Sequence, residues 1–132
     1  MLNHANAVKW AVAVASVETA ATGLVLIISP PLFGRLIFGA EFSAAGEALG
    51  RLTGIALLGF ALTTWPAPAV KSCSLSAQSA LLVYNVLATI YLAYLGLTSN
   101  LAGILFWPAV GLHLVLTALL AWASAAERAT NT

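Results

Sequence analysis

Residues 8–29 read VKWAVAVASVETAATGLVLIIS, an apolar stretch in which only Lys9 and Glu18 carry charge, followed directly by Pro30 and Pro31. A helix of about 20 apolar residues crosses the roughly 30 Å hydrocarbon core of a bilayer. The stretch therefore predicts a transmembrane helix that stops at the two prolines. It is too long for the apolar part of a signal peptide, and Glu18 interrupts it, so we interpret it as a permanent span.

The composition indicates that lipid solvates the rest of the chain as well. Of the 132 residues, 61% are hydrophobic and 7% are charged, whereas soluble domains carry about 25% charged residues. A soluble domain of this size buries only about two-thirds of the surface that its unfolded chain exposes. The formal net charge is +1, which gives no basic field for nucleic acid.

Three further stretches have the length and apolarity of spans, at about residues 46–65, 76–97 and 101–123. We therefore predict an all-α fold: an integral membrane four-helix bundle that forms a single domain over residues 1–132. A tight turn at about residues 98–100 predicts that the last two spans are antiparallel neighbours.

Residues 31–45 connect the first two spans. Apolar side chains recur at helical spacing at Leu32, Phe33, Leu36 and Ile37, which favours a short helix lying in the membrane interface. Glycines at positions 34 and 39 weaken such a helix. A short interfacial helix and an irregular lid both remain open.

The placement of basic residues predicts the orientation. Lys9, Lys71 and Arg128 fall on one side of the predicted membrane, and Arg35 and Arg51 fall on the other. Cytoplasmic loops carry the excess of Lys and Arg, so we predict that both termini lie in the cytoplasm.

A glycine series in the second span predicts close helix packing. Gly46, Gly50 and Gly54 recur at four-residue spacing and would form a smooth groove for the backbone of another helix. The first span offers a partner series, also at four-residue spacing: Ala11, Ala15, Thr19 and Gly23. Packing within the chain is favoured, and a homo-oligomer interface is the alternative.

Three polar residues on three different spans are expected near the bilayer centre. Glu18 and Asn85 each lie about 13 Å deep at 1.5 Å per residue, and His113 lies about 15 Å from the same face. Thr89 and Thr117 lie one turn from Asn85 and His113, respectively. If the fourth helix begins near Pro108, which suits a first turn, His113 lies closer to the outer surface.

This convergence has two interpretations. Ionisable groups inside a membrane are energetically costly, so those that are present often have a functional role. The first interpretation is therefore a proton-titrating or ligand-binding site formed by Glu18, Asn85 and His113, with Thr89 and Thr117. The second is a structural cluster of hydrogen bonds between helices. Tyr84 and Tyr91 share a helix face and could form an aromatic wall.

Other chemistries are not supported. Glu47 and Arg51 are spaced for a local ion pair at the outer end of the second span, or Arg51 could guide an anion together with Arg35. His4 and His113 are far apart in sequence, so we predict no metal site. Because the sequence shows neither an activated nucleophile nor a cofactor motif, we predict no catalytic residues and no cofactor, and an enzyme is less favoured than a non-catalytic protein.

Three motifs occur together: RLTG at residues 51–54 followed by Gly59 and WP at 65–66, LVYN at residues 82–85, and FWP at 106–108 followed by GLH at 111–113. This pattern resembles small four-span inner-membrane proteins of bacteria that have no assigned function. The resemblance implies a location in the bacterial inner membrane. It also implies that a recurring sequence pattern includes Arg51, Asn85, Trp107 and His113.

A second resemblance is to small multidrug-resistance transporters, which are four-span chains with a membrane glutamate in the first helix. Glu18 matches that glutamate, whereas the aromatic and glycine motifs of the family's later helices have no counterpart here. The likeness implies proton-coupled transport only by analogy.

Three functions follow as hypotheses. The leading one is a membrane protein, self-associating in the bilayer, with a polar midplane pocket that binds or transports a small ligand or a proton-coupled solute. The alternative is a non-catalytic accessory or assembly subunit of a larger membrane complex. The third is a quinone or haem site at His113.

Overall fold

The computed structural model describes residues 4–65 and 71–130, with side chains described for residues 6–65 and 77–125. These ranges are helical and contain no strand. The elements are α1 (His4–Ile28), α2 (Pro30–Phe33), the π-helical turn η1 (Gly34–Phe38), α3 (Ala44–Thr64), α4 (Lys71–Thr98) and α5 (Phe106–Thr130). Within the described ranges, α1, α3, α4 and α5 are each long and apolar enough to cross a membrane. The all-α membrane bundle is therefore confirmed, and the chain is a multi-pass membrane protein.

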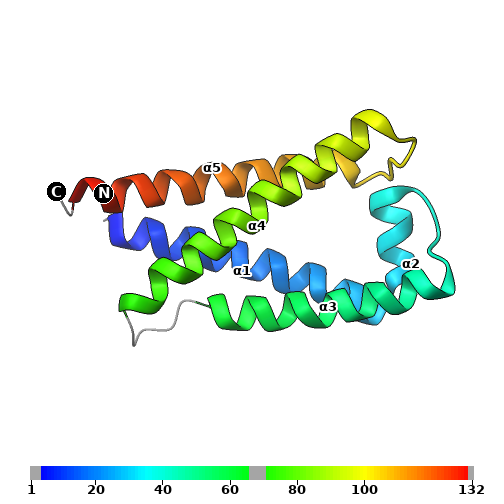
Figure 1. Ribbon diagram of the computed structural model, residues 1–132, viewed down its shortest axis with the longest axis horizontal. Coiled ribbons are helices and arrows are strands. Elements are labelled where there is room, and N and C mark those ends of the chain that lie inside the picture. The colour runs from blue at the N-terminus through cyan, green and yellow to red at the C-terminus, as the bar shows by residue number, and fades with distance from the viewer. Residues whose placement is uncertain (1–3, 66–70, 131–132) are drawn as a thin grey trace.

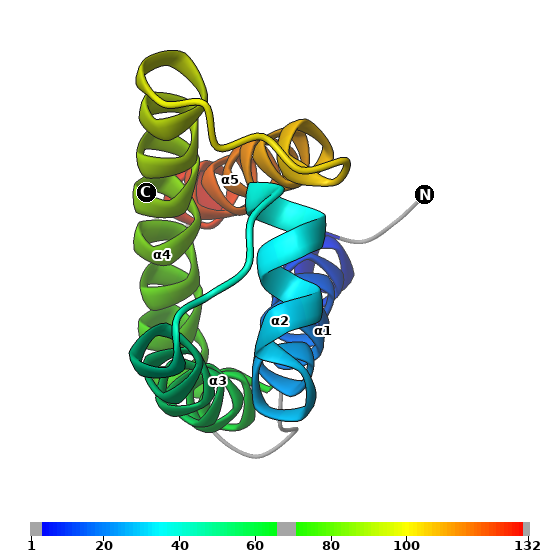
Figure 2. The ribbon, with the colours of Figure 1, turned by 90° about the vertical axis from the view of Figure 1, so that its right-hand side faces the viewer.

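The two ends of the bundle differ in what they carry. Both chain termini lie at one end, which we call the terminal end (Figure 1). The short helical segment formed by α2 and η1 lies across the opposite end, which we call the α2 end (Figures 1 and 2). The predicted short helix between the first two spans is thus present.

Helix α1 is the interior helix of the bundle. In the apolar 18-residue stretch of each spanning helix, the buried share is 39% for α1, compared with 11% for α3, 11% for α4 and 28% for α5. A buried cluster at its terminal half combines small α1 residues with leucines of α4 and α5: Ala11, Val12, Ala15, Leu81, Leu116 and Leu120. The outer surfaces of α3 and α4 remain apolar, as lipid contact requires.

The segment across the α2 end follows from its prolines and glycine. Because the residue before a proline avoids the helical region, α1 ends and Ser29 takes φ −146° and ψ 77° before Pro30. Gly39 ends η1 with φ 68°, a left-handed conformation that glycine adopts without strain. Ser43 then caps α3, because its hydroxyl accepts a hydrogen bond from the Gly46 N–H at 3.2 Å.

The fourth span starts later than the expected residue 101 and close to the alternative start near Pro108. Helix α5 begins at Phe106, and residues 99–105 form a longer connection than the expected tight turn. The Gly103 and Leu105 N–H groups each donate a 2.8 Å hydrogen bond to the end of η1, at the carbonyls of Ile37 and Leu36. Helix ends need such partners, and this pairing between distant segments keeps the connection extended. Helices α4 and α5 are nevertheless antiparallel neighbours (Figure 1).

The glycine series brings α3 against α1 of the same chain. A Cβ atom on Gly54 would lie 2.6 Å from the Gly23 carbonyl oxygen of α1, and one on Gly50 would lie 3.6 Å from the Leu26 side chain of α1. The Ser16 and Thr64 hydroxyls add a buried hydrogen bond of 3.0 Å between these helices. Gly46 does not extend this contact as predicted, because a Cβ there would meet Phe42 and Ser43 of its own segment.

Candidate functional site

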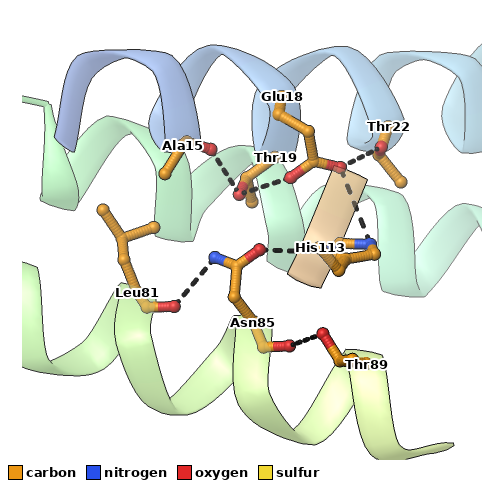
Figure 3. A network of polar contacts seen from close by, with 8 residues as sticks. All are labelled: Ala15, Glu18, Thr19, Thr22, Leu81, Asn85, Thr89 and His113. Atoms are coloured by element: carbon orange, nitrogen blue, oxygen red, sulfur yellow. Dashed lines mark hydrogen bonds and ion pairs between the residues drawn. The ribbon is translucent and has the colours of Figure 1, made fainter. Parts of the chain in front are cut away.

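Three helices bring Glu18, Asn85 and His113 together (Figure 3). The His113 Nδ1 atom lies 2.9 Å from Asn85 Oδ1, and the His113 Nε2 atom lies 3.9 Å from Glu18 Oε1. The histidine and glutamate side chains are 9% and 11% exposed, and Asn85 is fully buried. The later start of α5 does not move His113 out of this group.

The hydrogen bonds of Asn85 determine which nitrogen of His113 carries a proton. The Asn85 amide nitrogen donates to the Leu81 carbonyl at 2.9 Å, and a carbonyl only accepts. The amide oxygen of Asn85 therefore faces His113, so Nδ1 must be the donor in the 2.9 Å contact. In a neutral imidazole the other nitrogen then has a lone pair, and this lone pair on Nε2 faces Glu18.

The Glu18 carboxyl lies beside two threonines of its own helix, of which one is a good hydrogen-bond donor to it. Thr22 donates to Oε1 at 3.0 Å. Thr19 lies 3.4 Å from Oε2, but its single hydroxyl proton points to the Ala15 carbonyl at 2.8 Å. The carboxyl therefore has one good internal donor, and its Oε1 still has a lone pair for a further donor.

Aromatic rings fix the imidazole plane from the α4 side. The Tyr84 ring packs on His113 edge to face, with 5.8 Å between centroids and 79° between planes. Tyr84 in turn packs against Phe60 of α3, with centroids 5.8 Å apart. The expected wall of Tyr84 and Tyr91 does not form, because Tyr91 is 61% exposed.

A cavity of about 310 Å³ opens beside the pair, toward the α2 end. Glu18, Thr22 and His113 supply its polar groups. Apolar side chains from α2, η1, α4 and α5 form most of the other walls, among them Phe33, Phe38, Leu92, Ala109 and Leu112.

Sequence reasoning missed the part of the cavity wall formed by α2, η1 and the residues before α5. Phe33, Ile37, Phe38 and Leu105 line the cavity because the backbone pairing of residues 103 and 105 with η1 holds them there. The helical spacing of Phe33 and Ile37 was visible in the sequence. The segment on which they would pack was not.

The hydrogen bonds of the two threonines predicted for the site do not reach the Glu18 carboxyl or the His113 ring. Thr89 donates to the Asn85 backbone carbonyl at 2.7 Å. The Thr117 hydroxyl oxygen is buried and has no hydrogen-bond partner in the structure. Neither residue lines the cavity.

The predicted outer charged pair forms, away from the cavity. Arg51 Nη2 lies 3.4 Å from Glu47 Oε2, and the two side chains are 50% and 31% exposed. Arg35 forms an exposed ion pair with Glu41 in the same way. Because each arginine has an acidic partner in water, neither is a free cation for guiding an anion.

The site has few potential metal ligands. Among the residues that the structure describes, no group of three His, Cys, Asp or Glu side chains could hold a metal ion. At the cavity, His113 Nε2 and the Glu18 carboxyl are the two groups with coordinating atoms of that kind. The structure thus offers a carboxyl–imidazole pair rather than a metal centre.

Fold and site define a class: a four-span helical membrane protein with a carboxyl–imidazole pair at the wall of an apolar cavity. No family model, no curated protein and no solved structure matches the chain. The function of the site is inferred from its own geometry.

Proposed function

We propose that the chain is a bacterial inner-membrane protein that binds or transports a small solute beside a proton-titrating pair, Glu18 and His113. One observation carries this proposal: a carboxyl oxygen and an imidazole nitrogen from different helices lie 3.9 Å apart at the wall of a cavity. A purely structural cluster would have no need of a cavity beside its ionisable atoms.

The pair is suited to hold one proton. With Nδ1–H bonded to Asn85, a proton arriving at Nε2 lies next to the carboxylate and forms a neutral ion pair. An isolated charge in an apolar interior is expensive, so the neutral pair keeps its one proton unless a bound group or water stabilises the carboxylate that remains without it. A solute that contacts either atom changes the proton affinity of the pair, and proton binding changes the solute affinity by the same factor.

Access to the pair is one-sided in this conformation. The cavity lies toward the α2 end, whereas the fully buried Leu81, Leu116 and Leu120 close the terminal side about one to two turns away. A binding protein needs only this state. A transporter needs a second state in which the leucines separate.

The proposed orientation places both termini in the cytoplasm and the α2 end outside. Lys9 is at the terminal end, and the Trp10, Trp65 and Trp122 side chains near it are more than half exposed, as an interfacial belt requires. Reporter fusions after Arg128 should report cytoplasm, and fusions near Glu41 should report the outer side. The reverse pattern would exclude this orientation.

The alternative, a non-catalytic accessory or assembly subunit of a larger membrane complex, is favoured by the surfaces of α3 and α4. Large apolar side chains there are 57–63% exposed, including Leu52, Ile55, Val83 and Leu87. Lipid or a partner helix covers such a surface equally well. In this alternative the polar residues only connect helices.

Nitrogen NMR and titration calorimetry separate the two proposals. In purified wild type, the His113 Nε2 signal should change between its protonated and unprotonated forms with pH, and Glu18→Gln should change the pH at which this happens. Solute binding, screened with organic cations, anions and quinones from about pH 5 to 9, should vary with pH. Glu18→Gln should abolish that variation and His113→Ala should shift its midpoint, while Glu41→Gln, which removes an exposed carboxyl, should do neither. A His113 nitrogen signal that does not change with pH, together with a flat response to the whole panel, would leave the accessory role.

A further inference from the structure

The distance within the pair has a chemical consequence. At 3.9 Å, the His113 Nε2 and Glu18 Oε1 atoms are too far apart for a direct hydrogen bond. The same distance lets a single atom lie about 2.9 Å from both of them, the usual length of an N–H···O bond. Both atoms belong to residues that line the cavity, so a solute in the cavity can place a group between them.

Both atoms accept hydrogen bonds once the pair has lost its proton. Asn85 assigns the imidazole proton to Nδ1, which leaves a lone pair on Nε2. Oε1 takes one donor from Thr22 and keeps a second lone pair. The group that fits between them must therefore donate two hydrogen bonds. A primary amino group does so, a hydroxyl donates one, and a carbonyl, a carboxylate or a quaternary ammonium group donates none.

The rest of the cavity sets the size and polarity of the solute. Its volume is about 310 Å³, and a protein cavity of about 150 Å³ accommodates benzene. The phenyl rings of Phe33 and Phe38, themselves packed edge to face with centroids 6.0 Å apart, lie in the wall. An aromatic ring on the solute can pack against them in the same geometry.

We infer that the solute is a small arylalkyl primary amine, with its ring in the apolar cavity and its nitrogen between Glu18 and His113. This inference rests on the proposed function, that the pair binds a solute and a proton. No covalent bond forms. The ammonium group replaces the proton held by the pair, and that proton leaves from Nε2 to water.

The surrounding charges are compatible with this exchange. From α4 the group facing the imidazole is the neutral Tyr84 phenol ring, and from α1 it is Glu18 itself. The basic residues described on η1 and α3, Arg35 and Arg51, are in exposed ion pairs with acidic residues. None of these groups supplies a competing cation in the cavity.

Matched phenyl compounds test the inference by calorimetry on the purified full chain. The probes are 2-phenylethylamine, its trimethylammonium analogue, 2-phenylethanol and 3-phenylpropionate. The primary amine should bind saturably, and the quaternary analogue should bind at least about tenfold more weakly, because it loses both charge-assisted hydrogen bonds. The alcohol should be weaker than the amine, and the carboxylate should not bind.

Proton release gives a second readout. Measured in two buffers of different ionisation enthalpy, the primary amine should release up to one proton per molecule bound. Its affinity should rise about tenfold per pH unit wherever the pair holds its proton. Glu18→Gln should remove both the proton release and most of the affinity, whereas Glu41→Gln should leave both unchanged.

Each outcome of these experiments either supports the inference or overturns it. Equal or tighter binding of the quaternary analogue would overturn the requirement for N–H donors, and preference for the carboxylate would overturn the assigned charge. No binding by any probe would overturn the inference even if the His113 Nε2 signal still changes with pH, in which case the proposed function survives. A His113 nitrogen signal that never changes would remove the proposed function itself.

Discussion

Helix α1 has two faces at the same level of the bundle, and they are packed in opposite ways. Toward α3, the Gly23 and Gly54 backbones are so close that an added Cβ on Gly54 would lie 2.6 Å from a carbonyl oxygen. Toward α5, Glu18 and His113 stop 3.9 Å apart beside a cavity of about 310 Å³. The face toward α3 has no room for an added Cβ at Gly54, whereas the face toward α5 borders a cavity large enough for a small molecule.

The difference shows how a small helical bundle can be stable and still contain a cavity. Lipid gives little hydrophobic drive for helices to associate, so van der Waals contact must supply it. The α1–α3 face supplies that contact over many residues, and the leucine cluster continues it at the terminal end. The α5 face can then hold a polar pair and a cavity at a tolerable cost.

The largest effect is expected from a substitution that disrupts the close packing of α1 against α3. Gly54→Ala should lower the free energy of unfolding by about 3 kcal/mol, the upper part of the overpacking range, because the atom it meets is backbone and cannot turn aside. Unfolding in a denaturing detergent titration measures it. Gly59→Ala is the control, since an added Cβ there meets nothing within 4 Å. Equal stabilities for the two variants would show that α1 and α3 do not pack closely.

A smaller effect is expected at Asn85, which orients His113 on the cavity side of the bundle. Asn85→Leu should cost about 1 kcal/mol, because it removes a buried acceptor from the His113 Nδ1–H group. Nitrogen NMR of His113 should also show the proton of the neutral ring moving from Nδ1 to Nε2. Thr89→Val, which removes only a bond to a backbone carbonyl, should leave the histidine signals unchanged. An unchanged tautomer in Asn85→Leu would contradict the role given to Asn85.

The open face should accept added volume where the closed face cannot. Ala109→Leu places extra carbons in the cavity, so stability should stay the same or rise by up to about 1 kcal/mol. Binding of 2-phenylethylamine should be lost at the same time. A clear destabilisation would mean that the cavity is already filled by packing, and the contrast with Gly54 would disappear.

The smallest effect is expected at Thr117. Its buried hydroxyl has no partner, so Thr117→Val should change the free energy of unfolding by no more than about 0.5 kcal/mol, or raise it slightly. The same detergent titration measures this. A loss above about 1 kcal/mol would show that the hydroxyl has a partner in the membrane and belongs to the polar network after all.

Much of the candidate site was predictable from depth along each span. Counting residues from one face placed Glu18, Asn85 and His113 at one level, and the structure brings these three together. The same count placed Thr89 and Thr117 nearby, but a helix turn fixes only which side a residue faces. It does not show whether the hydroxyl reaches another helix or its own backbone, as Thr89 does.

The sequence by itself determined the solvent and the existence of four spans, because apolar length and proline act locally along the chain, and it favoured a short helix before α3. Only the tertiary structure decided where α5 begins, which tautomer His113 adopts and where the cavity lies. Each of these depends on a contact between distant segments: Gly103 with Ile37, Asn85 with His113, and η1 with α5. Such contacts depend on how the helices cross, which the periodicity of a single helix does not determine.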